Sequence, residues 1–397
     1  MKAPFSLKEF LREFDHRIAV VVAANFISVA ARMSLVTFLG IYFVRQAGIE
    51  LATVGAAFLC ENLLRGLAAP VFGALSDRMG RRPLLIGSAA ATAVVLPCFL
   101  LVEGPASLFA WSLALGLTGA VNMPVATAQL LDLAPPERRQ AVLALNYTGM
   151  SVAYTLGVMP AGYVAEQGYG FLAATSALGY VVVAALYVFA LRGTLPLEAR
   201  PPESTFKASL FALRDPLFLG FAAVGFVFPF SMGQVVTASP LFAADQGLHE
   251  GYIGLVLGGN SIIVAALALP VASRMEAKGP FRFLPAAAAL VCLAFVSYSL
   301  LPNPATAYLV GTIVFSFGEL IFSSAVPAAV ARIAPGGRRG AYQGAWALVA
   351  SFSMGSALLL SSALRDAAGW EFAWLGYAGL LAAAAMAFAV ARRRFER

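Results

Sequence analysis

Four ionisable side chains lie deep inside apolar stretches of this sequence. Arg32, Glu61 and Arg65 fall in the first two stretches, and Glu319 falls in the tenth. An unpaired charge at the centre of a bilayer costs between about 3 and more than 10 kcal/mol, so each group needs a partner, water or a change of protonation. Residues of this kind are typical of sites that bind ions, protons or charged substrates.

Arg32 and Glu61 lie near the middle of two consecutive stretches that run in opposite directions. Opposite charges at one depth on neighbouring helices predict an ion pair, and Arg65, one helical turn from Glu61, competes for the same carboxylate. One interpretation is that this cluster only locks the first two helices together. The other is that it binds a substrate or a proton, which would make Glu61 a candidate for proton coupling.

Glu319 is the only ionisable residue deep in any apolar stretch of the second half. It lies between Ser316 and Ser323, with Phe315 and Phe322 nearby. Desolvation disfavours the charged form of a carboxyl. We therefore expect Glu319 to take up a proton from one side of the membrane and release it to the other. The alternative is a protonated acid that only packs, hydrogen-bonded to a serine or a backbone carbonyl.

The elements that position these residues are long apolar helices. Of the 397 residues, 60% are hydrophobic and only 12% are charged, whereas soluble proteins carry about 25% charged residues. Spans of about 20 apolar residues cross a bilayer as helices, and continuous runs of this length exclude the alternating strands of a β-barrel. The predicted spans are 18–44, 51–72, 84–102, 106–131, 140–164, 170–191, 216–243, 251–273, 283–301, 305–331, 341–363 and 372–391. The fold class is therefore an all-α polytopic membrane protein.

The distribution of basic residues predicts the orientation of these spans. If the N-terminus is cytoplasmic, 23 of the 27 Lys and Arg residues lie on the cytoplasmic side, as the positive-inside rule requires. Both termini are then cytoplasmic, and the location is a plasma (inner) membrane of the bacterial type. The same bias accounts for the net charge of +7, so we expect no nucleic-acid partner.

The link between the second and third spans carries small and charged residues in a specific order. It reads Gly73-Ala74-Leu75-Ser76-Asp77-Arg78-Met79-Gly80-Arg81-Arg82-Pro83 and is called the signature loop below. Its glycines permit close helix approach and a positive φ, and its arginines bind carboxylates or anionic headgroups. The order resembles the G-x-L-x-D-R-x-G-R-[RK] motif between helices 2 and 3 of the major facilitator superfamily, and every consensus position is met.

This resemblance implies a conformational gate at the cytoplasmic end of the protein. Its predicted members are Gly73, Asp77, Arg78, Gly80, Arg81, Arg82 and Asp132. Asp132 ends a polar stripe with Asn122 and Gln129 on the fourth span, and the resemblance pairs it with Arg78 or Arg81. Asp132 is also a candidate for proton coupling.

The resemblance further implies twelve transmembrane helices in two pseudo-symmetric six-helix bundles. An internal repeat supports this, because Ala134-Pro135-Pro136-Glu137-Arg138-Arg139-Gln140-Ala141 matches Ala334-Pro335-Gly336-Gly337-Arg338-Arg339-Gly340-Ala341 at five of eight positions. The predicted organisation is a cytoplasmic amphipathic segment (1–17), an N-terminal bundle (18–191), a cytoplasmic linker with a short surface helix (192–215), a C-terminal bundle (216–391) and a basic cytoplasmic tail (392–397).

Repeated six-helix units predict a substrate cavity near mid-membrane between the halves. Helices 1, 4, 7 and 10 line it, as the resemblance implies. The polar and aromatic residues expected there are Asn25, Arg32, Glu61, Asn122, Gln129, Gln234, Asn260, Glu319, Tyr342 and Trp346. An apolar, aromatic cavity with few charges suits lipophilic or cationic small molecules.

The sequence therefore predicts a secondary active transporter that works by alternating access. No G-x-x-x-x-G-K-[ST] loop is present, so we expect no cofactor and a proton gradient as the energy source. The chain resembles 12-helix drug:proton antiporters, although residues 157–163 of the fifth span contain the ingredients of their G-P-x-x-G-G motif without its order. This run is equally typical of close helix packing. Proton-coupled uptake by symport and lipid or lysolipid flipping remain alternatives within the same fold.

An intramembrane enzyme or a non-transporting receptor is a remote alternative. The two histidines, His16 and His249, fall outside the spans on opposite sides, so no histidine-based catalytic site is expected. Cys60, Cys98 and Cys292 have no spacing pattern for a metal site. We expect no enzymatic activity, no bound metal, a small-molecule substrate, a surrounding lipid bilayer and a monomeric protein.

Overall fold

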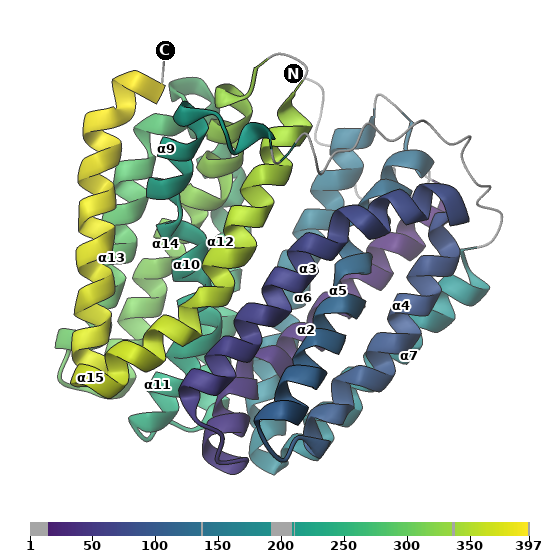
Figure 1. Cartoon of the computed structure of the whole chain (residues 1–397), viewed down its shortest axis with the longest axis horizontal. Helices are drawn as coiled ribbons and strands as arrows, with labels where there is room; N and C mark the ends of the chain where they lie inside the picture. The colour runs from purple at the N-terminus through teal and green to yellow at the C-terminus, as the bar shows by residue number, and fades with distance from the viewer. Residues whose placement is uncertain (1–14, 136–137, 192–208, 210, 336–337, 396–397) are drawn as a thin grey trace.

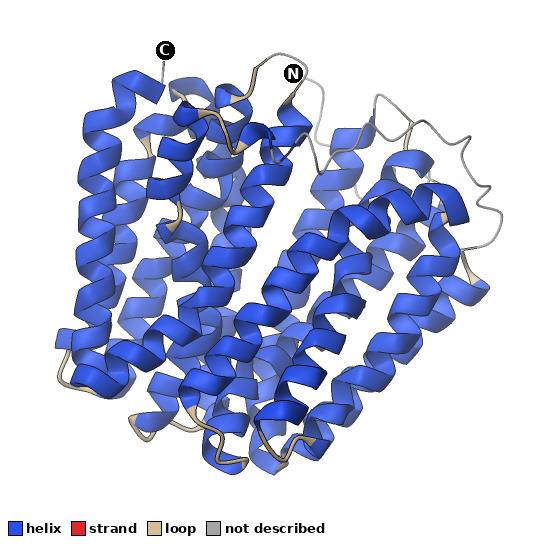
Figure 2. Ribbon diagram, viewed as in Figure 1, coloured by secondary structure: helices blue, strands red, loops and turns tan. Residues whose placement is uncertain are grey.

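In the computed structural model, residues 15–135, 138–191, 209, 211–335 and 338–395 are described. Figures 1 and 2 show helices throughout this part of the chain, and it contains no strand. Eleven of its helical segments are long and apolar enough to cross a membrane. The last, α15 (Arg339–Phe395), holds two spans, because the chain reverses at Gly369, where φ is 84° and ψ is 169°. The predicted helical membrane fold is therefore present.

The first half of the chain contributes six spans. They are α2 (His16–Ile41) with its π-helical extension (Tyr42–Gln46), α3 (Leu51–Met79), α4 (Arg81–Val95) with a 3-10 turn (Leu96–Leu101), α5 (Pro105–Leu133), α6 (Arg139–Gln167) and α7 (Tyr169–Phe189). In this half α2 packs against α6 and α7, and α3 packs against α5. Arg32 lies on α2 and Glu61 lies on α3, and both helices are packed against other helices of this half.

The second half repeats this arrangement. Its first span is divided into α9 (Pro216–Gly225), α10 (Val227–Gly233), a π-helical turn (Gln234–Ala238) and α11 (Ser239–Asp245). It continues with α12 (Glu250–Lys278), a 3-10 turn (Pro280–Arg282), α13 (Leu284–Leu300), α14 (Pro304–Ile333) and the two spans of α15. In this half α13 packs against α14 and α15, and α12 packs against α14.

Side-chain caps mark the starts of three spans. Asp15 accepts a hydrogen bond from the backbone N–H of Arg17 at 2.9 Å, Asp215 accepts one from Leu217 at 2.8 Å, and Asn303 accepts one from Thr306 at 2.9 Å. These bonds satisfy backbone donors that a helix start leaves free. The hydrogen bond from the Arg17 side chain also lowers the pKa of the Asp15 carboxyl from its ordinary value.

Glycine turns repeat between the halves at nearly constant spacing. Gly80 and Gly279 have φ values of 87° and 82°, which only glycine adopts readily, and they lie 199 residues apart. Gly168 and Gly369, also at positive φ, lie 201 residues apart. The same backbone reversals therefore recur in both halves, in agreement with the repeat seen in the sequence.

The two bundles touch closely at one end and diverge at the other (Figure 1). We call the end that carries the signature loop the signature face. Near the opposite face, α3 packs against α15, and a Cβ at Gly55 would lie 2.5 Å from the Cα of Leu359. There α6 also packs against α12, and a Cβ at Gly254 would lie 2.8 Å from the carbonyl oxygen of Val158. Glycine thus allows backbone contact between the halves at that face.

Several predicted boundaries fall outside the described residues. Residues 1–14 of the predicted amphipathic segment 1–17 lie outside them. The first helix begins at His16, two residues before the predicted span. Most of the linker, residues 192–208 and 210, and the last two residues of the tail also lie outside the described residues. The surface helix and the amphipathic segment therefore stay predictions.

Candidate functional site

Two adjoining cavities lie between the halves and together form what we call the central cavity. One has a volume of about 1170 Å³, and the other has a volume of about 900 Å³. They share lining residues on α3, α5 and α15: Gly66, Ala69, Pro124, Ala128 and Ala347. The smaller one is lined by Asp77, Arg78 and Arg81 of the signature loop. The central cavity therefore reaches the signature face.

Three of the predicted cavity residues line its larger part: Asn25, Arg32 and Asn122. Asn25 is held in place by Asn146 of α6, whose side-chain oxygen accepts a hydrogen bond from the Asn25 amide at 2.8 Å. Sequence reasoning missed Asn146 and also Tyr180 of α7, which lines the cavity as well. Both are polar residues inside apolar spans, and this signal was available in the sequence.

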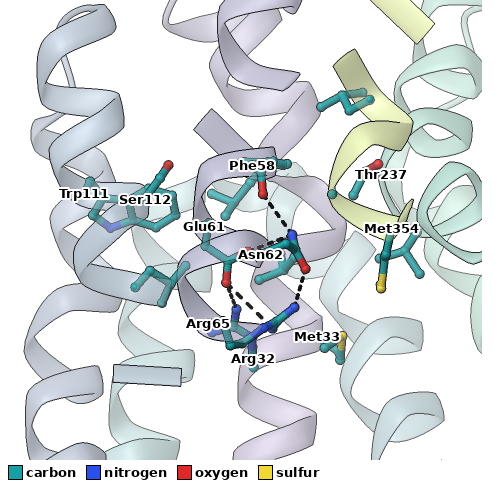
Figure 3. A pocket seen from close by; sticks show the side chains of 16 residues that line it. Arg32, Met33, Phe58, Glu61, Asn62, Arg65, Trp111, Ser112, Thr237 and Met354 are labelled. Carbon is teal, nitrogen blue, oxygen red and sulfur yellow. Dashed lines mark hydrogen bonds and ion pairs between the residues drawn. The ribbon is translucent and has the colours of Figure 1, made fainter. Parts of the chain in front are cut away.

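Arg32, Glu61, Asn62 and Arg65 form a buried ionic group, which we call the α2–α3 charge cluster (Figure 3). Arg32 Nη2 lies 2.5 Å from Glu61 Oε1, and Arg65 Nη1 lies 3.7 Å from the same oxygen. Asn62 donates to Glu61 Oε2 at 2.9 Å and accepts from Arg65 Nη2. The predicted pairing of Arg32 with Glu61 is therefore present, and Arg65 shares the carboxylate.

This cluster stands at the inner end of the central cavity. Beyond it lies a small enclosed pocket of about 60 Å³, lined on its far side by Thr237 and Met354 of the second half (Figure 3). Arg32, Met33 and Arg65 line both this pocket and the central cavity. A molecule that entered from the signature face would therefore meet the charge cluster before it reached the closed face.

Glu319 lies in a second polar group, the α12–α14 carboxyl cluster, formed with Asn260 and Ser316. Asn260 donates its amide N–H to Glu319 Oε2 at 3.0 Å. The Ser316 hydroxyl donates to the amide oxygen of Asn260 at 2.5 Å. In the described part of the chain Glu319 makes no ion pair. Tyr147 and Tyr154 of α6, in the first half, are close enough to interact with it electrostatically.

The partner of Glu319 differs from the expected one. Ser323 donates to the backbone oxygen of Leu320 at 3.3 Å, and Ser316 bonds to Asn260 instead of to the carboxyl. Asn260 on α12 was predicted only as a cavity residue. Asn260 of α12 therefore binds the carboxyl in place of the serines. A serine within a helix tends to donate to the backbone carbonyl three or four residues earlier in its own helix.

The signature loop makes its ion pairs within the first half. Arg81 binds Asp132 through Nε and lies 3.3 Å from Asp77, and Asp77 remains half-exposed, at 51%. Arg82 donates to the last backbone carbonyls of α7, those of Tyr187 and Val188, at 3.1 and 2.7 Å, where a cation complements the helix dipole. The predicted contact of Asp132 with an arginine is present, and the gating role stays a prediction.

Four further predicted cavity residues line neither of the two cavities described above, and their place at a substrate site stays a prediction. They are Gln129, Gln234, Tyr342 and Trp346, all buried. Gln234 donates to the backbone oxygen of Ala357 and accepts from Ser361, Tyr342 donates to the capping carboxylate Asp215 at 2.7 Å, and Trp346 packs on Phe221. The side of α15 that faces the cavity instead carries Gln343, Ala347 and Ser351.

The described residues contain no group of three or more His, Cys, Asp or Glu side chains that would hold a metal ion. The three cysteines are free. The acidic side chains that this arrangement offers for binding are Glu61 and Glu319, each with its polar neighbours.

Comparison with known proteins places this geometry in a family. The chain is 25% identical to a Na(+), Li(+), K(+)/H(+) antiporter of Planococcus maritimus over 92% of this chain and 94% of the relative. It is 24% identical to the multidrug resistance protein MdtG of Dickeya zeae over 70% of this chain and 71% of the relative. Among solved structures, a point mutant of the nucleoside transporter NupG superposes with a TM-score of 0.79 at 14% identity, covering 94% of this chain and 99% of that one.

The sequence profile of the Major Facilitator Superfamily matches residues 21–308 and 230–397. These two matches cover both bundles, the signature loop and the central cavity between them. Together with the repeated six-helix architecture, they establish that this chain belongs to the major facilitator superfamily of membrane transporters.

Proposed function

We propose that this protein is a proton-coupled secondary transporter that exports small lipophilic molecules by alternating access. The observation that carries the proposal is the central cavity. It reaches the signature face, ends at the α2–α3 charge cluster and is separated from the opposite face by close contact between the halves. One rocking movement of the bundles would close this entrance and open the other.

The contacts that such a movement must break lie near the opposite face. Glu166 at the end of α6 accepts a hydrogen bond at 2.8 Å from the backbone N–H of Gly251, in the first turn of α12. His249 lies 3.2 Å from the same carboxylate. These contacts join the two halves. Asp77 and Arg78 at the signature face would make the corresponding contacts once the signature face closes.

Glu319 is the proposed coupling carboxyl. It lies near α6 of the first half, and its described partner, Asn260, is neutral. A half-buried carboxyl without a cation beside it tolerates a proton well, because the neutral acid needs no counter-ion. Movement of α6 relative to α14 would expose Glu319 alternately to the two sides. Glu61 and Asp132, both held by arginines, are then less suited to carry the proton.

The lining of the cavity supports lipophilic substrates. Alongside the charge cluster it carries Met33, Met123 and Met150, and flexible methionine side chains adapt to apolar molecules of different shape. Similarity to a protein named as a multidrug resistance protein points the same way. The sequence also predicts cationic molecules as substrates.

An inorganic cation is the second candidate for the exchanged substrate. It is favoured by the similarity to a Na(+), Li(+), K(+)/H(+) antiporter over nearly the whole chain. Sodium would need a set of oxygen ligands, and Glu319 with Asn260 supplies carboxylate and amide oxygens at one place.

We also propose that the signature face is cytoplasmic in a plasma membrane of the bacterial type, with both termini on that side. The arginines of the signature loop, which line the cavity entrance there, fit the positive-inside rule. A monomer with no cofactor, driven by the proton gradient, suffices for this mechanism, because both halves of the cavity come from one chain.

A flux assay in proteoliposomes tests the proposed function. Purified protein is reconstituted with an imposed pH gradient, and accumulation of lipophilic fluorescent dyes is measured with and without the gradient. Parallel vesicles carry a sodium gradient and a pH-sensitive dye, which distinguishes dye export from sodium exchange. Uphill dye movement should require the pH gradient.

The Glu319→Gln variant keeps the shape of the side chain but removes its titration. It should abolish pH-driven accumulation and leave downhill movement at least partly intact. Glu103→Gln, an exposed acid outside the spans, is the matched control and should behave as wild type. If Glu319→Gln accumulates dye at the wild-type rate with the same pH dependence, Glu319 does not couple transport to protons.

A further inference from the structure

The α2–α3 charge cluster contains more positive charge than its single acid can neutralise. Arg32 and Arg65 both approach Glu61, and Asn62 completes the group as a neutral partner. Apart from Glu61, the described groups that act electrostatically on Arg65 are Arg32 and Tyr180, and neither is an acid at neutral pH. The inner end of the central cavity therefore carries a net charge of about +1 in a setting of low dielectric.

One donor of the cluster is left without a partner. Arg32 Nη1 is buried and has no hydrogen-bond acceptor among the described residues. The hydroxyl of Ser28, one turn earlier on α2, is also buried and has no hydrogen-bond partner among them. Ser28 and Arg32 both line the central cavity. A buried charged donor that stays unpaired is costly, and guanidinium is a fork of donors that matches carboxylate and phosphate groups. An anionic acceptor would satisfy it.

The helix opposite this donor leaves room for such an acceptor. Gly119 of α5 faces the arginines, and a Cβ at this position would lie 3.4 Å from Arg32 Nη1 and 3.5 Å from Arg65 Cδ. Any larger side chain would occupy the space beside the free donor. Arg65 is held only loosely by the carboxylate, at 3.7 Å, and its side chain is 29% exposed, so it can turn toward a ligand.

We propose that the inner end of the central cavity is an anion-binding site and that the transported molecule is a lipophilic organic anion. Its acidic group binds Arg32 and Arg65 beside Gly119, and its apolar body lies against Met33, Met123 and the neighbouring wall of the cavity. This inference rests on the proposed transport function and names its substrate class. It replaces the cationic cargo expected from the sequence, because a cation at this position would meet a site of the same sign.

Equilibrium binding of three probes with one ring system tests the assignment. The probes are 2-naphthoate, the neutral 2-naphthamide and the cationic 2-naphthylmethylammonium, and the protein is held in nanodiscs of phosphatidylcholine, which has no net charge. Because one charge-assisted hydrogen bond contributes enough to change affinity at least about tenfold, naphthoate should bind at least about tenfold more tightly than the amide. Tighter binding of the cation, or equal binding of all three, would overturn the proposal.

Substitutions of Arg65, with one control elsewhere, locate the site. Arg65→Gln leaves the Arg32–Glu61 pair intact and removes the excess charge, so the preference for naphthoate should disappear, whereas Arg65→Lys should retain most of it. Arg45→Gln removes an exposed arginine outside the cavity and should have no effect. An unchanged naphthoate preference in Arg65→Gln would contradict the assignment.

Gly119→Ala tests the same site with every charge in place, which keeps the proposal testable if Arg65→Gln does not fold. The added methyl group should weaken naphthoate binding, whereas Gly379→Ala, at a position with open space, should not. Wild-type affinity for naphthoate in Gly119→Ala would count against the site. None of these measurements needs a proton gradient, so the anion site and the proposed proton coupling fail or succeed separately.

Discussion

Each half of the protein carries an acidic side chain within its helical bundle, but the surroundings of the two acids differ. In the first half, Glu61 lies between two arginines and an asparagine. In the second half, Glu319 has the neutral amide of Asn260 as its described partner and makes no ion pair within the described residues. Glu61 therefore has cationic partners on both sides, whereas Glu319 has no opposite charge beside it among the described residues.

The same contrast appears at the signature face. In the first half, Asp132 at the end of α5 binds Arg81, just after the turn at Gly80. In the second half, position 332, which lies 200 residues later, carries an arginine, and this side chain lies beside the equivalent turn at Gly279. Pseudo-symmetry thus preserves the backbone but not the charges. The Arg81–Asp132 ion pair of the first half therefore has no counterpart with a carboxylate at position 332 of the second half.

Removal of Glu61 should have the largest effect, because Glu61 is the carboxylate that Arg32 and Arg65 share. Glu61→Leu leaves two buried guanidinium groups without their carboxylate, and a stranded partner of this kind costs about 3–5 kcal/mol. The yield of folded protein and its thermal unfolding temperature in detergent should both fall. The double variant Arg32→Met with Glu61→Leu should be milder, since Arg65 retains Asn62 and exposure to the cavity.

A double variant as damaging as the sum of the two single variants would show that Arg32 and Glu61 are not energetically coupled. Glu103→Gln is the control for the loss of an acid at an exposed position.

Asp77→Asn should have the next largest effect, on the balance between conformations. In the structure Asp77 contacts only Arg81 among the described residues and is half-exposed, which is consistent with a gate that is open at this face. Loss of its charge should favour this open state by about 1–3 kcal/mol. Spin labels at Met79 and Arg339, placed in a variant without the native cysteines, report the distance across the signature face. Unchanged distance distributions would remove Asp77 from the gate.

Glu166→Gln should have a smaller effect of the opposite sign. The carboxylate of Glu166 binds the first turn of α12 across the boundary between the halves, and charge near a helix N-terminus contributes about 0.3–1 kcal/mol. The variant should open the face that is closed here. Spin labels at Glu50 and Gln246 should then show a larger population at long distance, and a population equal to that of wild type would mean that this contact does not hold the face shut.

Much of this architecture was predictable from the sequence, because bilayer spans leave a strong signal in composition and length. The sequence also predicted the signature loop, the repeat at a spacing of about 200 residues, and the pairs Arg32–Glu61 and Arg81–Asp132. In each case a charge inside or beside an apolar span needs a partner, and few candidates exist. Scarcity of charged residues is what made these pairings predictable.

The neutral polar residues were harder to place, because their number leaves many possible partners. Gln234 and Tyr342 were expected in the cavity but form hydrogen bonds within the second half. Asn146, which holds Asn25, was not selected at all. Whether such a residue faces the cavity depends on how far each helix is rotated about its own axis, and this rotation is set by packing against helices distant in the sequence. The unpartnered donor of Arg32 and its position beside Gly119 likewise emerged only from the structure.

We expect Glu319 to exchange a proton with the two sides of the membrane. Infrared spectroscopy of the protein in lipid measures this directly, because a protonated carboxyl has a C=O stretching band that a carboxylate lacks. We expect a band that disappears as the external pH is raised, that is missing in Glu319→Gln and that is unchanged in Glu103→Gln. A band that persists in Glu319→Gln with the same pH dependence would show that Glu319 is not the group that exchanges the proton.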